Sequence, residues 1–319
     1  MLRAVFLALA VFALAACASI EPSSRTKRIA LTFDDTPRMA GAFMTPDERA
    51  VRLRKALRDA QVKQAAFFVN PAQLTHRPGG LEHIRGYVAD GHVLANHTAQ
   101  HSSLTNSSLD EYLADIDAAA EWLAPWEANR PWFRFPYLNE GRGDVEKRDA
   151  VRQALAERGL TNGYVTVDAS DWFYEQATID AARTGQDMDM DALRDLYVES
   201  HVESAEFFDS LARETLGRSP AHVMLLHETD LAALYIGDLV EALRAAGWTI
   251  ITADEAYEDP FGKLAATYDT PSAQGTLTEQ VAWERGIPAP RWYARNNTKL
   301  AKAEFDRRVL GIEADGESE

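Results

Sequence analysis

The sequence predicts an α/β fold built on a parallel sheet of about seven strands. Three observations support this: short apolar runs alternate with amphipathic helical patterns, the helical patterns have recognisable ends, and chemically reactive residues follow the apolar runs. Strands that alternate with helices imply parallel strands covered by helices on both faces. Periodicity alone leaves open whether such a sheet closes into a barrel or stays open.

Seven short apolar runs are the predicted strands. Helix starts lie between them at Thr45 and Ser108, each of which opens a capping box with a Glu three residues later. Gly91, Gly159 and Gly247 stand where helices are expected to end. In chain order, the predicted strands are residues 28–33, 65–69, 92–95, 132–135, 163–167, 222–226 and 248–252.

The first residues predict export. Ala4 to Ala16 is an apolar run of ~13 residues after Arg3, which is typical of a secretory signal and shorter than the ~20 residues that span a bilayer. Cys17 follows Leu-Ala-Ala as in a bacterial lipoprotein box, so we expect lipidation of Cys17 and removal of residues 1–16. An ordinary signal peptide with a chance cysteine is the alternative. By resemblance to lipoproteins of two-membrane bacteria, Ala18 in place of Asp suggests sorting to the outer membrane, facing the periplasm.

Composition limits the other function classes. Cys17 is the only cysteine, so no internal disulfide can form, and the core must hold the fold unaided. The formal net charge of −16 argues against nucleic acid as a partner, and we expect membrane contact through the lipid anchor only. We expect a tether (17–27), a catalytic domain (28–259) with a helical insertion at about 173–220, and a C-terminal extension (260–319).

Two clusters suggest a metal site. Asp34 and Asp35 directly follow the first strand, and a buried carboxylate needs a metal, a partner or a proton. His97 and His101 have the spacing that puts two imidazoles on one face of a helical turn, where they can share a cation. With one Asp they would form three ligands and leave one position open, as catalytic sites do. A solvated turn and structural histidines are the alternatives.

Three further clusters also follow strands, and the carboxyl ends of parallel strands are where active sites assemble. Residues 134–137 contain an arginine, which can form two hydrogen bonds to a carboxylate, and a backbone amide that could face an oxyanion. Residues 168–172 contain two aspartates. Residues 225–227 end in a histidine, a residue suited to proton transfer near neutral pH. Each of these clusters alone could be structural.

Taken together and in this order, the five clusters resemble the motifs of the NodB-homology polysaccharide deacetylases, the family 4 carbohydrate esterases. The resemblance runs from about Arg28 to Thr252. It implies a distorted (β/α)7-type barrel, here with a helical insertion and a C-terminal extension. Thr36 and Leu138 depart from the family pattern, because both stand where a glycine is common.

The resemblance implies that Asp35, His97 and His101 hold a divalent metal, usually zinc. It makes Asp34 the general base that takes a proton from the metal-bound water, and Arg134 the residue that orients Asp34 and keeps it ionised. Such a metal lowers the pKa of its water and polarises the amide carbonyl.

By the same resemblance, the Tyr137 amide holds the oxyanion together with the metal. His227 protonates the departing amine, and Asp171 is the charge partner of His227. Trp172 and Leu225 would wall the pocket for the acetyl methyl group. These assignments follow from the family pattern and not from the spacing of the residues.

The function that the resemblance implies is metal-dependent removal of N-acetyl groups from the N-acetylated amino sugars of a polysaccharide in the cell envelope. Two alternatives stay open. One is a deacylase of a non-polymeric or lipid-linked sugar, and the other is a catalytically silent lipoprotein that binds glycan.

Overall fold

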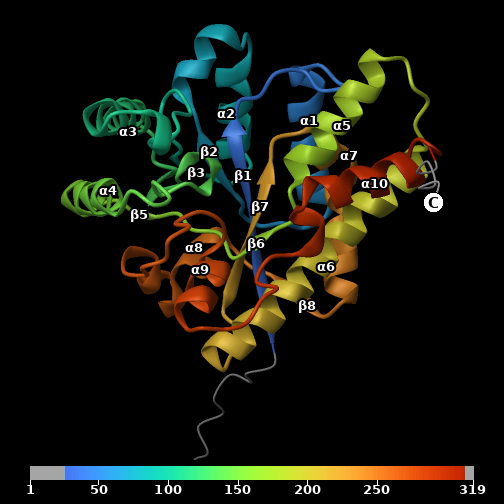
Figure 1. Ribbon diagram of the computed structural model, residues 1–319. Helices are drawn as coiled ribbons and strands as arrows, with labels where there is room; N and C mark the ends of the chain where they lie inside the picture. Colours follow the sequence, from blue (N-terminus) through green and yellow to red (C-terminus); the bar gives the residue numbers. More distant parts are fainter. Residues whose placement is uncertain (1–25, 313–319) are drawn as a thin grey trace, which may run out of the picture.

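The computed structural model describes residues 26–312. Its centre is a curled sheet in which every strand pairing is parallel, and the arrowheads of β1 and β7 point to the same edge (Figure 1). The order across the sheet is β5-β4-β3-β2-β1-β7-β6, and β8 pairs with the beginning of β1. The strands are β1 (Lys27–Thr36), β2 (Ala66–Val69), β3 (Val93–Asn96), β4 (Asn129–Phe133), β5 (Thr161–Asn162), β6 (Val167–Asp168), β7 (Ala221–His227) and β8 (Trp248–Ile250).

The predicted strand at 163–167 is replaced by a segment that joins the two edges of the sheet. Its first residues form β5, which pairs with β4, and its last form β6, which pairs with β7. Gly163 at its centre has no room for a side chain, since a Cβ there would lie 2.6 Å from the Phe68 ring. Counting this segment once, the sheet has the seven-stranded, (β/α)7-type architecture that was predicted.

The helices start and end where local signals place them. Both predicted capping boxes are present, and Gly91, Gly159 and Gly247 follow helix ends with positive φ angles, which glycine adopts at little cost. The helices are α1 (Pro46–Asp59), α2 (Gly80–Ala89), α3 (Leu109–Leu123), α4 (Val145–Glu157), α5 (Asp171–Arg183), α6 (Met190–Leu216), α7 (Asp230–Ala245), α8 (Ala253–Tyr257), α9 (Leu277–Glu284) and α10 (Thr298–Arg308).

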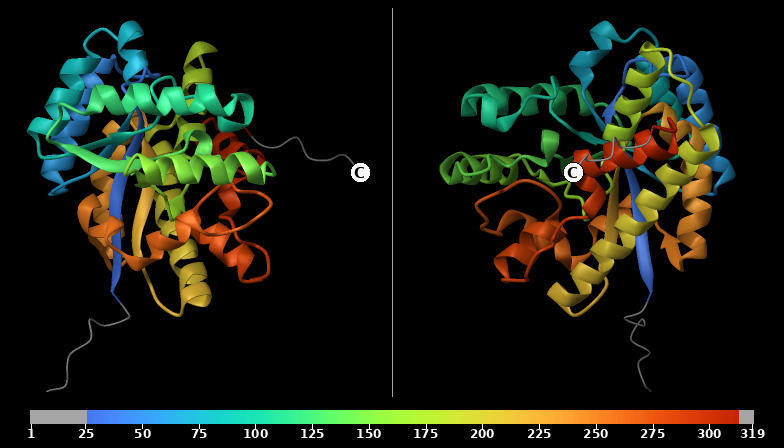
Figure 2. Two further views of the ribbon diagram at one scale, coloured as in Figure 1. Left: turned by 90° about the vertical axis from the view of Figure 1, so that its left-hand side faces the viewer. Right: turned by 45° about the vertical axis from the view of Figure 1, so that its right-hand side comes forward.

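The predicted insertion and extension both pack onto the sheet domain. Helices α5 and α6 occupy the insertion, and α6 buries Leu196, Tyr197 and Phe208 in the main core. In the extension, α10 lies against α5 and α6 and buries Phe305 (Figure 2). The exact boundaries of both segments stay predictions.

The predicted signal segment, Cys17 and most of the tether lie outside the described residues. Within residues 26–312, no helix has both the length and the apolar character that crossing a bilayer requires.

Candidate active site

The predicted site residues gather at the carboxyl edge of the sheet. Asp34 and Asp35 lie near the end of β1, and His227 is the last residue of β7. His97 directly follows β3, and Arg134 directly follows β4. Parallel strands end at the same edge, so residues that are far apart in the sequence become neighbours there.

Three side chains form a candidate metal centre. Asp35 Oδ1 lies 3.0 Å from His101 Nε2 and 3.4 Å from His97 Nε2, and the three candidate ligand atoms all lie within 4.8 Å of one another. Asp35 Oδ1 is buried and, apart from these two imidazoles, has no partner among residues 26–312, whereas buried polar atoms are normally satisfied. Two imidazole nitrogens and an unsatisfied carboxylate oxygen fit a divalent cation.

The surroundings of Asp35 favour its ionised form. Burial alone would raise the pKa of Asp35, but the two imidazoles and the Arg38 guanidinium hold that pKa well below its ordinary value. Arg38 Nη1 donates to Asp35 Oδ2 at 2.6 Å and leaves Oδ1 facing the histidines. His97 Nδ1 lies 2.8 Å from the Arg134 carbonyl, and a proton shared there leaves His97 Nε2 free to bind a metal.

The predicted helical turn at 97–101 is wrong, because this segment is a loop. Thr98 and His101 have positive φ angles of 57° and 64°. Two asparagines hold the loop: Asn70 Nδ2 donates to the carbonyls of His97 and Thr98, and Asn96 Oδ1 accepts from the Thr98 amide. The loop still brings the imidazole rings to 5.0 Å from each other. Sequence reasoning missed both asparagines, although each directly follows an apolar run.

Asp34 is held by a buried arginine. Arg134 Nη1 donates to Asp34 Oδ1 at 2.5 Å, and both side chains are nearly inaccessible to solvent. The other guanidinium contacts are also satisfied, with Gly163 O at 2.7 Å, Thr32 Oγ1 at 2.8 Å and Tyr257 Oη at 2.7 Å. Because all three nitrogens of the guanidinium donate hydrogen bonds, it cannot easily turn away from Asp34, and the carboxylate orientation is fixed.

Tyr257 is a member of this network that sequence reasoning missed. Its hydroxyl accepts from Arg134 and donates to the Tyr164 carbonyl at 3.0 Å. Burial raises the pKa of Tyr257 to about 12, so the hydroxyl keeps its proton at neutral pH. No motif marks Tyr257 in the sequence, because α8 reaches Arg134 only through the fold.

His227 and Asp171 form a second pair, in which Asp171 is buried and His227 is partly exposed. Asp171 Oδ1 lies 2.7 Å from His227 Nδ1, and Asp171 Oδ2 accepts from the His227 backbone amide at 2.8 Å. Burial lowers the pKa of His227, but the attraction of Asp171 outweighs burial and raises this pKa to about 9. The imidazole is therefore protonated at neutral pH. Its Nε2 lies 4.0 Å from Asp35 Oδ2, next to the candidate metal centre.

Tyr137 lies in a strained turn beside His101. Tyr137 and Leu138 have φ angles of 60° and 50°, and the two aromatic rings of Tyr137 and His101 lie 4.6 Å apart. The positive φ explains why glycine is common in the family where this chain has Leu138. The C-terminal extension holds this turn: Gln274 Nε2 donates to the Tyr137 carbonyl and the Gly275 amide to the Leu138 carbonyl, both at 3.2 Å.

A cavity of about 350 Å³ adjoins Asp35 and His101. We call it the arginine cavity, because Arg38, Arg77 and Arg183 line it. The predicted walls of an acetyl pocket are not in its lining. Trp172 is exposed at the start of α5, and Leu225 is buried in a cluster around Tyr164 and Val165. Their assignment to an acetyl pocket stays a prediction.

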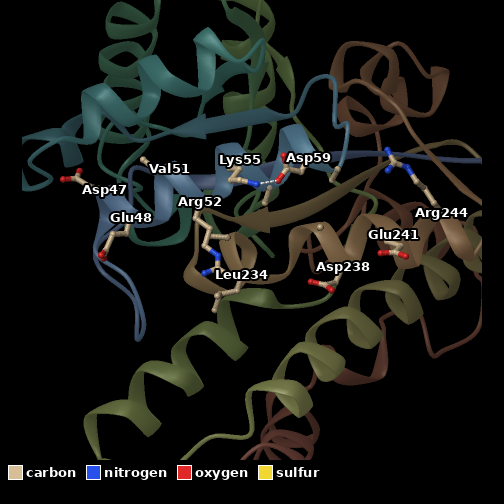
Figure 3. Close-up of a pocket in the computed structure, with 14 residues that line it drawn as sticks. Asp47, Glu48, Val51, Arg52, Lys55, Asp59, Leu234, Asp238, Glu241 and Arg244 are labelled. Atoms are coloured by element: carbon tan, nitrogen blue, oxygen red, sulfur yellow. Dashed lines mark hydrogen bonds and ion pairs between the residues drawn. The ribbon is translucent and has the colours of Figure 1, made fainter.

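A larger cavity lies elsewhere. It is a groove of about 1110 Å³ between α1 and α7, and charged side chains such as Arg52, Lys55, Asp238 and Arg244 line it (Figure 3). None of the candidate active-site residues lies in this groove, so its size does not make it the catalytic centre.

Comparison with known proteins identifies relatives of this chain. Residues 21–163 match the polysaccharide deacetylase family. Chitin deacetylase 1 of Saccharomyces cerevisiae is 30% identical over 176 residues, which are 55% of this chain and 50% of the yeast protein. A chitooligosaccharide deacetylase of a Bradyrhizobium species is 30% identical over 151 residues, 47% of this chain and 60% of that protein. The chain thus spans about half the length of the curated relatives it matches.

Solved structures show the same fold at lower identity. A polysaccharide deacetylase of Bacillus cereus superimposes with a TM-score of 0.52 at 20% identity, over 71% of this chain and 91% of the other. A Bacillus anthracis pseudoenzyme of carbohydrate esterase family 4 gives a TM-score of 0.51 at 16% identity, over 74% and 67%. The predicted resemblance to the polysaccharide deacetylases of NodB homology is thus confirmed: the family match covers residues 21–163, and the solved structures share the fold.

Proposed function

We propose that this chain is a metal-dependent hydrolase that removes N-acetyl groups from the amino sugars of a polysaccharide. The observation that supports this most strongly is the buried Asp35 Oδ1, which faces two imidazoles and lies beside the Asp34–Arg134 and Asp171–His227 pairs. The matched relatives are named for chitin and chitooligosaccharide deacetylation, which agrees with this substrate class.

The ligand set favours zinc. Imidazole nitrogens and one carboxylate oxygen suit Zn²⁺, and three protein ligands leave a position for the reacting groups. Asp35, His97 and His101 would hold the ion. When bound, such an ion lowers the pKa of a water molecule and polarises an amide carbonyl.

The proton transfers then fall to two residues of the chain. Asp34 is the base that takes a proton from the attacking water, and Arg134 keeps Asp34 ionised and correctly turned. His227, which is protonated at neutral pH because of Asp171, donates a proton to the amide nitrogen. An amine leaves poorly unless it is protonated, so an acid is required on this side. The Tyr137 amide would stabilise the oxyanion.

Metal analysis and acetate release test this proposal. His97→Ala should lose both the bound metal and acetate release from N-acetylglucosamine oligomers. Asp34→Asn should keep the metal and lose most turnover, and His227→Ala should also keep it and be impaired. His76→Ala, which changes an exposed histidine away from these residues, is the matched control. If the parent protein hydrolyses a substrate and either His97→Ala or Asp34→Asn hydrolyses it equally well, the assigned roles are refuted.

We also propose that the protein is exported and anchored through a lipid on Cys17, in the outer membrane and facing the periplasm. The apolar segment and the lipoprotein box before Cys17 support this. In a bacterial host, the parent should incorporate labelled fatty acid and sediment with outer membranes. Cys17→Ser should do neither. Labelled fatty acid in Cys17→Ser would show that the anchor is elsewhere, and an unlabelled parent would show that there is none.

A further inference from the structure

The arginine cavity concentrates positive charge beside the candidate metal centre of an acidic protein. The chain has a formal net charge of −16, yet three arginines from three separate segments line this one cavity. Its volume of about 350 Å³ falls within the range of about 300–1,000 Å³ that is usual for small-molecule sites. Asp35 and His101 are part of its lining, so a molecule bound there would also reach the metal ligands.

Arg77 is the arginine whose charge is least compensated. Its Nε is buried without a hydrogen-bond partner among residues 26–312. Burial lowers the pKa of Arg77, and repulsion from Arg38 and Arg49 lowers it further. Arginines elsewhere are matched closely, as Arg54 is with Asp90. A buried nitrogen that lacks an acceptor is costly, and a bound anion would remove that cost.

Arg38 is positioned but not saturated. It uses Nη1 for Asp35, its backbone amide donates to Glu228 Oε2 at 3.0 Å, and its carbonyl accepts from Arg49 Nη2 at 2.8 Å. These contacts fix where the guanidinium lies. Arg183, in the last turn of α5, is largely exposed, and its ion pair with Asp180 is a loose one at 3.7 Å.

The carboxylates in the cavity wall are poor counter-ions for these arginines. Glu175 already accepts from the backbone amides of Asp230 and Leu231, each at 3.2 Å. Burial, together with repulsion from Asp230, raises the pKa of Glu175 to about 7, so this carboxyl is partly neutral at physiological pH. Asp35 is engaged by Arg38 and, in the proposed enzyme, by the metal.

We propose that the arginine cavity binds an anionic group, a carboxylate or a phosphate, that the substrate carries close to its N-acetylated sugar. Planar guanidinium groups match the two oxygens of such anions, and Arg77 and Arg38 provide free N–H donors from two sides. Gln73 in the same wall can bond to hydroxyl or carbonyl groups of a sugar. This inference rests on the proposed function for the reacting amide and adds that the preferred glycan is charged.

Ligand binding to the full-length, zinc-loaded Asp34→Asn protein tests this inference without turnover. Three probes are titrated calorimetrically: neutral N-acetylglucosamine, N-acetylmuramic acid with a carboxylate, and N-acetylglucosamine 6-phosphate. We expect at least one charged probe to bind about tenfold more tightly than the neutral sugar, the size of one charge-assisted hydrogen bond at a partly exposed site. The charged probe that binds more tightly identifies the kind of anion that the cavity prefers.

Arginine variants in the same background locate the effect. Arg77→Gln should remove the preference for the charged probe, and Arg77→Lys should restore part of it. Arg244→Gln removes the same charge from the distant α1–α7 groove and should leave the preference intact. Equal binding of neutral and charged probes would overturn the inference. A preference that survives Arg77→Gln would do so too, because the anion would then be bound without the arginine whose charge this cavity leaves least compensated. Acetate release from neutral oligomers tests the deacetylase proposal separately.

Discussion

Replacing Glu175 by glutamine should raise the free energy of unfolding, relative to the parent, by more at pH 8 than at pH 5. Glu175 is buried beside Asp230, and its pKa is about 7 in the folded protein against an ordinary value of 4.5. Because the folded pKa is raised, this carboxyl contributes its full stability below pH 4.5 and loses it as the pH rises through 7. Linkage gives a loss of about 2.5 kcal/mol between pH 5 and pH 8 for such a shift. Glutamine cannot ionise, so the variant avoids this loss.

Urea unfolding of the parent and of Glu175→Gln at both pH values measures the effect. A chelator is present throughout, because a metal that binds the folded state adds its own stability. The side-chain NH2 group of glutamine would face one of the two backbone N–H groups that donate to Glu175. The cost of this contact is the same at both pH values, so it cancels in the comparison. Glu241→Gln, on the exposed face of α7, should show no such difference between the two pH values. A Glu175→Gln effect that is equal at pH 5 and pH 8 would refute the reasoning.

Three further substitutions probe contacts of the site. Asp171→Asn presents an N–H to His227 Nδ1 and should lower acetate release ~10²-fold or more at unchanged zinc content; near-parental activity would contradict the acid assignment. Gln274→Ala removes the donor to the Tyr137 carbonyl and should lower kcat about fivefold, the value of one neutral hydrogen bond, while KM is unchanged. Arg49→Met leaves two buried carboxylates without their cation and should cost about 3–5 kcal/mol of unfolding free energy; a loss below about 1 kcal/mol would show that Arg49 is dispensable.

The sequence predicted what local chemistry determines. Capping boxes at Thr45 and Ser108 are decided within four residues, and the structure contains both. Apolar runs mark strands that are buried on both faces, so the site residues that follow these runs could be expected at one edge. The positions of Asp35 and His227 agree with that reasoning.

What the sequence did not predict depends on contacts between distant segments. A spacing of four suits two histidines both on a helix and in a compact loop, and the loop is decided by Asn70, 27 residues before His97. Tyr257 meets Arg134 across 123 residues, and Gln274 meets Tyr137 across 137. No pattern in the sequence links these pairs. The strand predicted at 163–167 was misplaced for the same reason, because its pairing with both sheet edges is a property of the curled sheet.

The fold itself does not decide whether the protein is a catalyst. A structure of similar fold from Bacillus anthracis is described as a pseudoenzyme, and another from Bacillus cereus as a polysaccharide deacetylase. Catalysis therefore has to be inferred from individual atoms. In this chain an unsatisfied carboxylate oxygen on Asp35 would be costly without a cation, and a buried arginine fixes Asp34 beside it. A protein that only binds glycan has no need for either feature.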